Sequence, residues 1–175
     1  MPDPISFSPA ALEEVGRIVA NYPEDRRKSA LIPVLHLAQR EFGGWLSVPT
    51  MDYVASLLSI LPIEVYEVAD FYSMFNTRPV GTFTIEACRT APCALNGAED
   101  LVAHLESRLG IRDGETTADG MFTIKSAECL GSCGTGPVVQ VGEVYHERMT
   151  AARVDALLEE LREQSRRVAA DGAGA

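Results

Sequence analysis

The sequence predicts an α+β protein in which a bundle of helices precedes a smaller domain of alternating strands and helices. Up to about residue 75, apolar residues recur every three or four positions, which is typical of amphipathic helices. From residue 82 onward, stretches with two-residue alternation appear, which is typical of half-buried strands. Pro79 and Gly81 separate the two patterns. We therefore expect a helical lobe over 1–78, a second domain over 79–163 and a flexible tail over 164–175.

The first two helices of the lobe are bounded by capping residues and prolines. Ser8 is suited to cap the first helix, and Pro9 fits its first position, where a missing N–H is not needed. The apolar stripe of this helix stops at Pro23. A second helix is expected over 26–42. Because Pro33 lies inside this range, we expect either a late start or a kink.

Two further helices complete the expected lobe. The third follows Ser47 or Thr50, either of which can act as its cap, and the fourth begins at Pro62. Their apolar faces are small, so the four helices need one another to form a core. Three aromatic residues are interpreted as anchors of the helical lobe: Trp45, Phe71 and Tyr72.

The second domain has the element order strand, helix, strand, hairpin, helix. The strands are expected over 82–87 and 121–127, and the helix between them ends at Gly110. The hairpin turns at 142–143, and Thr150 caps the last helix. This is the order of a thioredoxin-like domain, and the right-handed crossover rule predicts that the first two strands are parallel.

The four cysteines form two pairs, each following an expected strand. Four residues separate Cys88 from Cys93, and three separate Cys129 from Cys133. Glycine, proline, serine and threonine surround both pairs, which is typical of loops. Loops that follow neighbouring strands can bring their thiols toward one point. Four thiolates at one point indicate a metal site, and a [2Fe-2S] cluster takes four such ligands.

Spacing alone leaves other uses of these cysteines open. A structural zinc ion is also held by four cysteines, although its ligand pairs are usually separated by two residues and at most four. Two disulfides are disfavoured because the N-terminus shows no secretion signal. Four unrelated buried thiols fit poorly with polar, glycine-rich loops. A thioredoxin dithiol needs a Cys-x-x-Cys spacing, which is absent here.

Composition excludes several functions. The 25 Asp and Glu residues exceed the 15 Lys and Arg residues, giving a formal charge of -10, so we expect no nucleic-acid binding. No apolar stretch has the length of a membrane span, so we expect a cytoplasmic chain without direct membrane insertion. No Gly-x-Gly-x-x-Gly motif follows a strand, so NADH is not expected to bind here. Three histidines are interpreted as structural or surface residues: His36, His104 and His146.

Several stretches beyond the cysteines share one resemblance. They are 44–47 (GWLS), 63–69 (IEVYEVA), 71–75 (FYSMF), 114–120 (GETTADG), 128–131 (ECLG) and 137–141 (PVVQV). Together with the cysteine spacing they resemble the E subunit of bacterial NADH:quinone oxidoreductase, respiratory complex I, over roughly residues 8 to 162. That family combines an N-terminal helical bundle with a thioredoxin-like [2Fe-2S] ferredoxin domain.

The resemblance implies an electron-transfer subunit with no catalytic residue of its own. It implies that Cys88, Cys93, Cys129 and Cys133 hold one [2Fe-2S] cluster. FMN and NADH are then bound only by a partner, the flavin-binding subunit of complex I, against which the helical lobe packs. A neighbouring iron-sulfur subunit is the second expected partner. The chain would lie peripheral to the inner face of the cell membrane as part of the complex.

Alternatives remain at this point. The same module serves as the diaphorase subunit of NAD-linked hydrogenases and formate dehydrogenases, and a zinc-stabilised adaptor is an alternative of another class. Without its partner, the chain could form a homodimer through the helical lobe. Arg89 departs from the family pattern; it either adds a positive charge beside the cluster or points to solvent.

Overall fold

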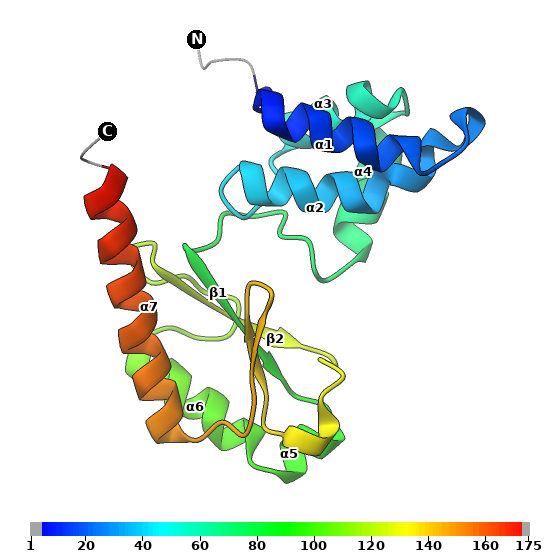
Figure 1. Ribbon diagram of the computed structural model, residues 1–175. Helices are drawn as coiled ribbons and strands as arrows, with labels where there is room; N and C mark the ends of the chain where they lie inside the picture. Colours follow the sequence, from blue (N-terminus) through cyan, green and yellow to red (C-terminus); the bar gives the residue numbers. More distant parts are fainter. Residues whose placement is uncertain (1–4, 173–175) are drawn as a thin grey trace. The chain divides into compact units, whose positions relative to one another are not determined.

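The computed structural model describes residues 5–172 of the chain. Contacts divide the chain into two compact units, residues 1–80 and residues 81–175 (Figure 1). Each unit contains its own hydrophobic core. The described residues of the first unit form helices and no strand, and the second unit combines helices with a four-stranded sheet. Across residues 5–172, no helix has the length and apolarity that crossing a membrane requires. The predicted fold class is confirmed.

The helical unit follows the sequence prediction closely. Ser8 caps the first helix by accepting the Ala11 N–H at 3.3 Å. Ser47, rather than Thr50, caps the third helix, since its hydroxyl accepts the Thr50 N–H at 3.2 Å. The elements are α1 (Pro9–Ala20), η1 (Glu24–Ala30), α2 (Leu31–Glu41), α3 (Val48–Leu58) and α4 (Pro62–Phe71).

The expected second helix begins late, at Leu31, after the 3-10 segment η1. Pro33 therefore lies in the first turn of α2. A first-turn N–H has no partner within its own helix, so the missing proline N–H costs no hydrogen bond there. Of the two expectations for Pro33, the late start is confirmed.

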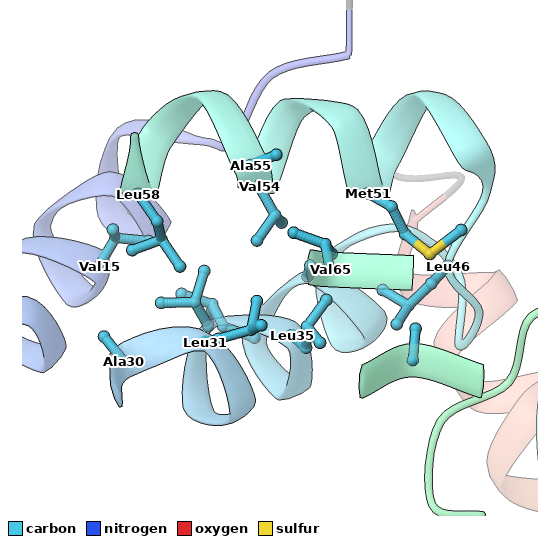
Figure 2. Close-up of a cluster of buried hydrophobic side chains, with 14 of the residues drawn as sticks. Val15, Ala30, Leu31, Leu35, Leu46, Met51, Val54, Ala55, Leu58 and Val65 are labelled. Atoms are coloured by element: carbon cyan, nitrogen blue, oxygen red, sulfur yellow. The ribbon is translucent and has the colours of Figure 1, made fainter. Parts of the chain in front are cut away.

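The core of the helical unit forms where α2 meets α3 and α4. In Figure 2, Leu31 and Leu35 of α2 point toward side chains of the other two helices. Val54 and Leu58 project from α3, and Val65 projects from α4. All five side chains are at most 2% exposed. Burial of one shared face therefore stabilises helices that are too short to be stable alone.

Two of the three predicted aromatic anchors are not in the core. Phe71 is 79% exposed and Tyr72 is 38% exposed, and their rings pack edge to face on each other. Trp45 is partly buried. The expectation fails because α4 is apolar on most of its surface, so the sequence does not indicate which row faces inward. The buried row is Val65 and Ala69, one helical turn apart.

The second unit contains a mixed sheet with the strand order β2-β1-β3-β4. As predicted, β1 and β2 are parallel, and β3 and β4 form an antiparallel hairpin. Side chains of α6 and α7 share one core with the strands, and the two helices lie side by side in Figure 1. The elements are β1 (Phe83–Cys88), α5 (Ala91–Leu95), α6 (Ala98–Leu109), β2 (Phe122–Ala127), η2 (Cys133–Thr135), β3 (Val139–Val141), β4 (Val144–His146) and α7 (Ala151–Gly172).

The last helix is longer than expected. It continues through Gly172, so residues 164–172 are helical where a flexible tail was expected, and residues 173–175 lie outside the described part. A pair of opposite charges four residues apart reaches into this extension: Arg167 pairs with Glu163 at 3.3 Å.

Leu35→Ala should destabilise the helical unit by about 2–5 kcal/mol, because Leu35 is fully buried and its removal leaves a cavity. Leu12→Ala is the matched control, since Leu12 of α1 is 42% exposed, and its expected cost is below about 1 kcal/mol. Urea unfolding followed by circular dichroism measures both. Equal costs for the two variants would contradict the described core.

Candidate metal centre

The candidate centre is built where β1 and β2 end side by side. Cys88 is the last residue of β1 and pairs in register with Ala127, the last residue of β2. The Cys88 Sγ lies 3.7 Å from the carbonyl oxygen of Glu128, the first residue after β2. The parallel register therefore places Cys88 beside the beginning of the segment that carries Cys129 and Cys133.

A short helix, which the sequence did not predict, brings Cys93 back to Cys88. Cys93 is the third residue of α5, and Pro92 lies in its first turn. Both thiols are buried, at 3% exposure for Cys88 and 2% for Cys93. They pack with Ala98 and the partly buried Leu130 in a small cluster separate from the main core. The first pair thus forms a preassembled dithiol.

The segment after the second pair runs directly over Cys93. A Cβ atom at Gly136 would lie only 3.1 Å from the Cys93 Sγ, so a larger residue here requires the sulfur or the segment to shift by a few tenths of an ångström. The backbone N–H of Val138 donates to the Cys93 sulfur, and the Cys88 N–H donates to the Val138 carbonyl oxygen at 3.1 Å. Residues 136–138, which follow the second cysteine pair in the sequence, therefore pack against Cys88 and Cys93.

The two buried thiols have opposite pKa shifts. Burial raises the pKa of Cys88, but hydrogen bonds outweigh this effect and lower it to about 7; they come from the Thr90 hydroxyl, the backbone N–H groups of Leu130 and Thr90, and the Cys93 thiol. Burial and the neighbouring Cys88 raise the pKa of Cys93, as does the nearby Cys133. Donors are thus already in place for a thiolate sulfur at Cys88, which is the form that binds metal.

The second pair is arranged differently. Cys129 and Cys133 are both exposed, and Cys133 begins the 3-10 segment η2. In Figure 1 this segment lies beside α5. Among residues 5–172, no three ligand-type side chains surround a single point. A [2Fe-2S] cluster does not require this, because each of its two irons takes only two protein ligands. The ligand set remains a prediction.

For Arg89 we expected either a positive charge beside the cluster or a side chain that points to solvent, and neither describes it fully. Its guanidinium donates to the Ser126 hydroxyl at 3.1 Å and lies 3.6 Å from the Asp113 carboxylate. Asp113 also accepts the Ser126 N–H at 2.7 Å. The Arg89 charge is therefore held at the end of β2 beside an opposite charge, and the side chain is still about half exposed.

Two of the histidines have clear structural roles. His104 of α6 contacts the Asp155 carboxylate of α7 at 3.0 Å and thereby links the two helices. His146 ends β4, and its partial burial lowers its pKa, which favours the neutral form. Neither role requires metal binding, in agreement with the interpretation from sequence.

Sequence reasoning missed the groups that surround the sulfurs. Thr90, Leu130 and Val138 contribute a hydroxyl and backbone N–H groups, and a spacing of cysteines carries no information about them. Gly136 is one of the glycines around the second pair, which predict that backbone N–H groups can approach the cluster sulfurs but not which groups do so. Its specific role, leaving room for the Cys93 sulfur, depends on the position of α5.

Comparison with known families identifies the class of protein. Residues 15–162 match the family model of the thioredoxin-like [2Fe-2S] ferredoxin. The chain belongs to this family, and the family expected from the sequence is confirmed. The match covers both the helical unit and the sheet-containing unit.

Relatives within this class are components of NADH-oxidising complexes. An E subunit of the NADH-quinone oxidoreductase of Rhizobium meliloti is 46% identical over 93% of this chain and 95% of its own length. The E subunit of the NADH-quinone oxidoreductase of Rickettsia bellii is 43% identical over 90% and 94%. The mitochondrial NADH dehydrogenase [ubiquinone] flavoprotein 2 of Dictyostelium discoideum is 41% identical over 97% and 72%.

A solved structure shows the same fold in another enzyme. An NAD+-reducing [NiFe]-hydrogenase in the air-oxidised state matches with a TM-score of 0.68 and 26% identity over 82% of this chain. This chain spans about a quarter (24%) of the length of that hydrogenase chain.

Gly136→Ala should destabilise the apoprotein by about 1–3 kcal/mol, because its Cβ would press on the Cys93 sulfur. Gly134→Ala is the matched control: a Cβ there meets nothing within 4 Å, and the expected change is within about 0.5 kcal/mol. Thermal unfolding of the reduced apoprotein measures both. A neutral Gly136→Ala variant would show that the segment does not approach Cys93 this closely.

Proposed function

We propose that Cys88, Cys93, Cys129 and Cys133 hold one [2Fe-2S] cluster, and that the chain passes single electrons within an NADH:quinone oxidoreductase. The observation that carries the proposal is the arrangement of two cysteine pairs at the common end of β1 and β2. Family membership independently supports an iron-sulfur cluster. The bound cluster would supply one-electron chemistry, and the chain supplies its ligands and their surroundings.

The residues fit the requirements of such a cluster. One pair is buried and the other exposed, so each iron can take one pair while one side of the cluster stays near the surface. Backbone N–H groups of Leu130 and Val138 point at the sulfurs of the first pair, a type of contact that tunes iron-sulfur sites. A structural zinc site usually separates its ligand pairs by two residues, whereas the pairs here are separated by four and three residues.

The oxidation of NADH itself is assigned to a partner. Residues 5–172 contain no Gly-x-Gly-x-x-Gly motif after a strand, so the flavin and the nicotinamide are proposed to bind to a flavin-bearing subunit. The cluster would accept electrons from that flavin one at a time. We further propose that the chain contacts a neighbouring iron-sulfur subunit. As part of the complex, it would lie at the inner face of the membrane.

The exposed apolar residues around α4 are proposed as the contact with the flavin-bearing subunit. They lie close together in the sequence, and all are at least 38% exposed: Leu61, Ile63, Phe71, Tyr72 and Met74. Exposed apolar groups of this size typically mark protein interfaces, and aromatic residues often dominate the binding energy.

The hydrogenase likeness supports a second setting for the same module. The TM-score of 0.68 shows that an NAD+-reducing enzyme of another kind contains this fold. Identity to the quinone oxidoreductase relatives is much higher, at 43% and 46%, and covers nearly their full length. We therefore favour the complex I setting. The identity of the catalytic subunit that copurifies with the chain distinguishes the complex I setting from the hydrogenase setting.

Substituting any one of the four cysteines by serine should weaken or abolish the cluster while both units stay folded. The variants are Cys88→Ser, Cys93→Ser, Cys129→Ser and Cys133→Ser. Electron paramagnetic resonance of the reduced protein measures the cluster, and circular dichroism measures the fold. Ala94→Ser is the control, because it adds a hydroxyl to α5 without removing a thiol. An unchanged spectrum in any Cys→Ser variant would exclude that residue from the ligand set.

Phe71→Ser should weaken binding to the flavin-bearing subunit by about 30-fold, which corresponds to the loss of about 2 kcal/mol at an aromatic contact. The matched control is Val168→Ser, which removes a 67% exposed apolar side chain from α7. Affinity measured with the purified partner tests this. Equal affinities for both variants would contradict the proposed interface, and loss of a homodimer instead would assign the surface to self-association.

A further inference from the structure

The segment that carries Cys133 is held by few backbone hydrogen bonds. Its only regular structure is η2, a single 3-10 turn of three residues, and both cysteines in the segment are exposed. Within η2 the Thr135 N–H donates to the Ser132 carbonyl oxygen at 3.1 Å. A metal ligand on such a segment needs an additional support to keep its position.

Two hydroxyl groups on either side of Cys133 and Gly134 meet one carboxylate. The Ser132 hydroxyl donates to the Glu147 Oε1 at 2.5 Å, and the Thr135 hydroxyl donates to the same oxygen at 2.7 Å. The two hydroxyl oxygens are themselves 2.7 Å apart. Because these bonds go to a charged acceptor, they are stronger than bonds between neutral groups. They lower the pKa of Glu147, so its carboxylate stays ionised near neutral pH.

The two residues after Glu147 bind the same segment through the backbone. The Arg148 N–H donates to the Thr135 carbonyl oxygen at 2.7 Å, and the Met149 N–H donates to the Pro137 carbonyl oxygen at 2.9 Å. Arg148 adopts a left-handed backbone conformation with a φ of 51°. The residues that follow β4 therefore run alongside the segment from Ser132 to Pro137 and attach it to the sheet.

We infer that Glu147 is the positioning residue for Cys133: through Ser132 and Thr135 it holds this ligand in place for the cluster. This inference rests on the proposed function. It assigns a role to a carboxylate that does not itself touch the cysteines. Glu147 lies 14 residues beyond Cys133 in the sequence, after the hairpin of β3 and β4.

The cluster-loaded full chain tests this role through the rate of iron release to a chelator. Glu147→Ala should release iron about 10-fold faster than the unmodified protein, as is typical when a supporting contact of a metal ligand is lost. Glu147→Gln should stay within about threefold, because its amide oxygen can still accept from both hydroxyls. Glu160→Gln, at an exposed position of α7, is the control for loss of charge.

A double variant tests the same contacts from the other side. Ser132→Ala with Thr135→Val removes both hydroxyls and keeps the carboxylate, so it should release iron as fast as Glu147→Ala. Thermal unfolding of each apoprotein shows whether the variant still folds. Release at the unmodified rate in both the double variant and Glu147→Ala would overturn the inference.

The apoprotein separates this inference from the proposed function. Alkylation of the reduced chain, mapped by mass spectrometry, gives the rate at Cys133 relative to Cys129. Glu147→Ala should change this ratio at least about threefold, and Glu147→Gln should restore it. A chain that never holds iron but shows this change would contradict the cluster and leave the positioning role intact. A chain that holds the cluster with an unchanged ratio and unchanged iron release would contradict only the positioning role.

Discussion

The parallel pairing of β1 and β2 is the constraint on which the candidate centre depends. Six residue pairs, from Phe83 with Phe122 to Cys88 with Ala127, fix the register of the two strands. A slip of one residue would turn every side chain to the opposite face and would separate Cys88 from Glu128. Because both strands end at the same edge, cysteine pairs that are far apart in the sequence emerge from neighbouring positions.

Around this edge, four features support the two cysteine pairs. A short helix returns Cys93 to Cys88, and Gly136 leaves room for the sulfur where the chain passes over it. Backbone N–H groups of Leu130 and Val138 stabilise negative charge on the buried thiols. The exposed pair lacks this burial, and the segment carrying it is attached to the sheet by Glu147 and Arg148. The fold thus buries the first cysteine pair and attaches the segment of the exposed second pair to the sheet.

Sequence patterns predicted the elements better than the details of the site. Ser8 and the alternation in β1 are local signals, and the structure follows them. For α4 the pattern was ambiguous, because a helix that is apolar on most sides does not reveal its buried face, and Phe71 proved exposed. The bonds of Glu147 to Ser132 and Thr135 span 15 and 12 residues, so only the folded hairpin brings these groups together.

The most direct test of the account is an assay of iron and acid-labile sulfide in the chain isolated anaerobically with its partner. A [2Fe-2S] cluster held by the four cysteines predicts about two irons and two sulfides per chain. It also predicts that the partner isolated with it contains a flavin. One zinc ion per chain without sulfide would contradict the proposed cluster and would assign the four thiolates to a structural site.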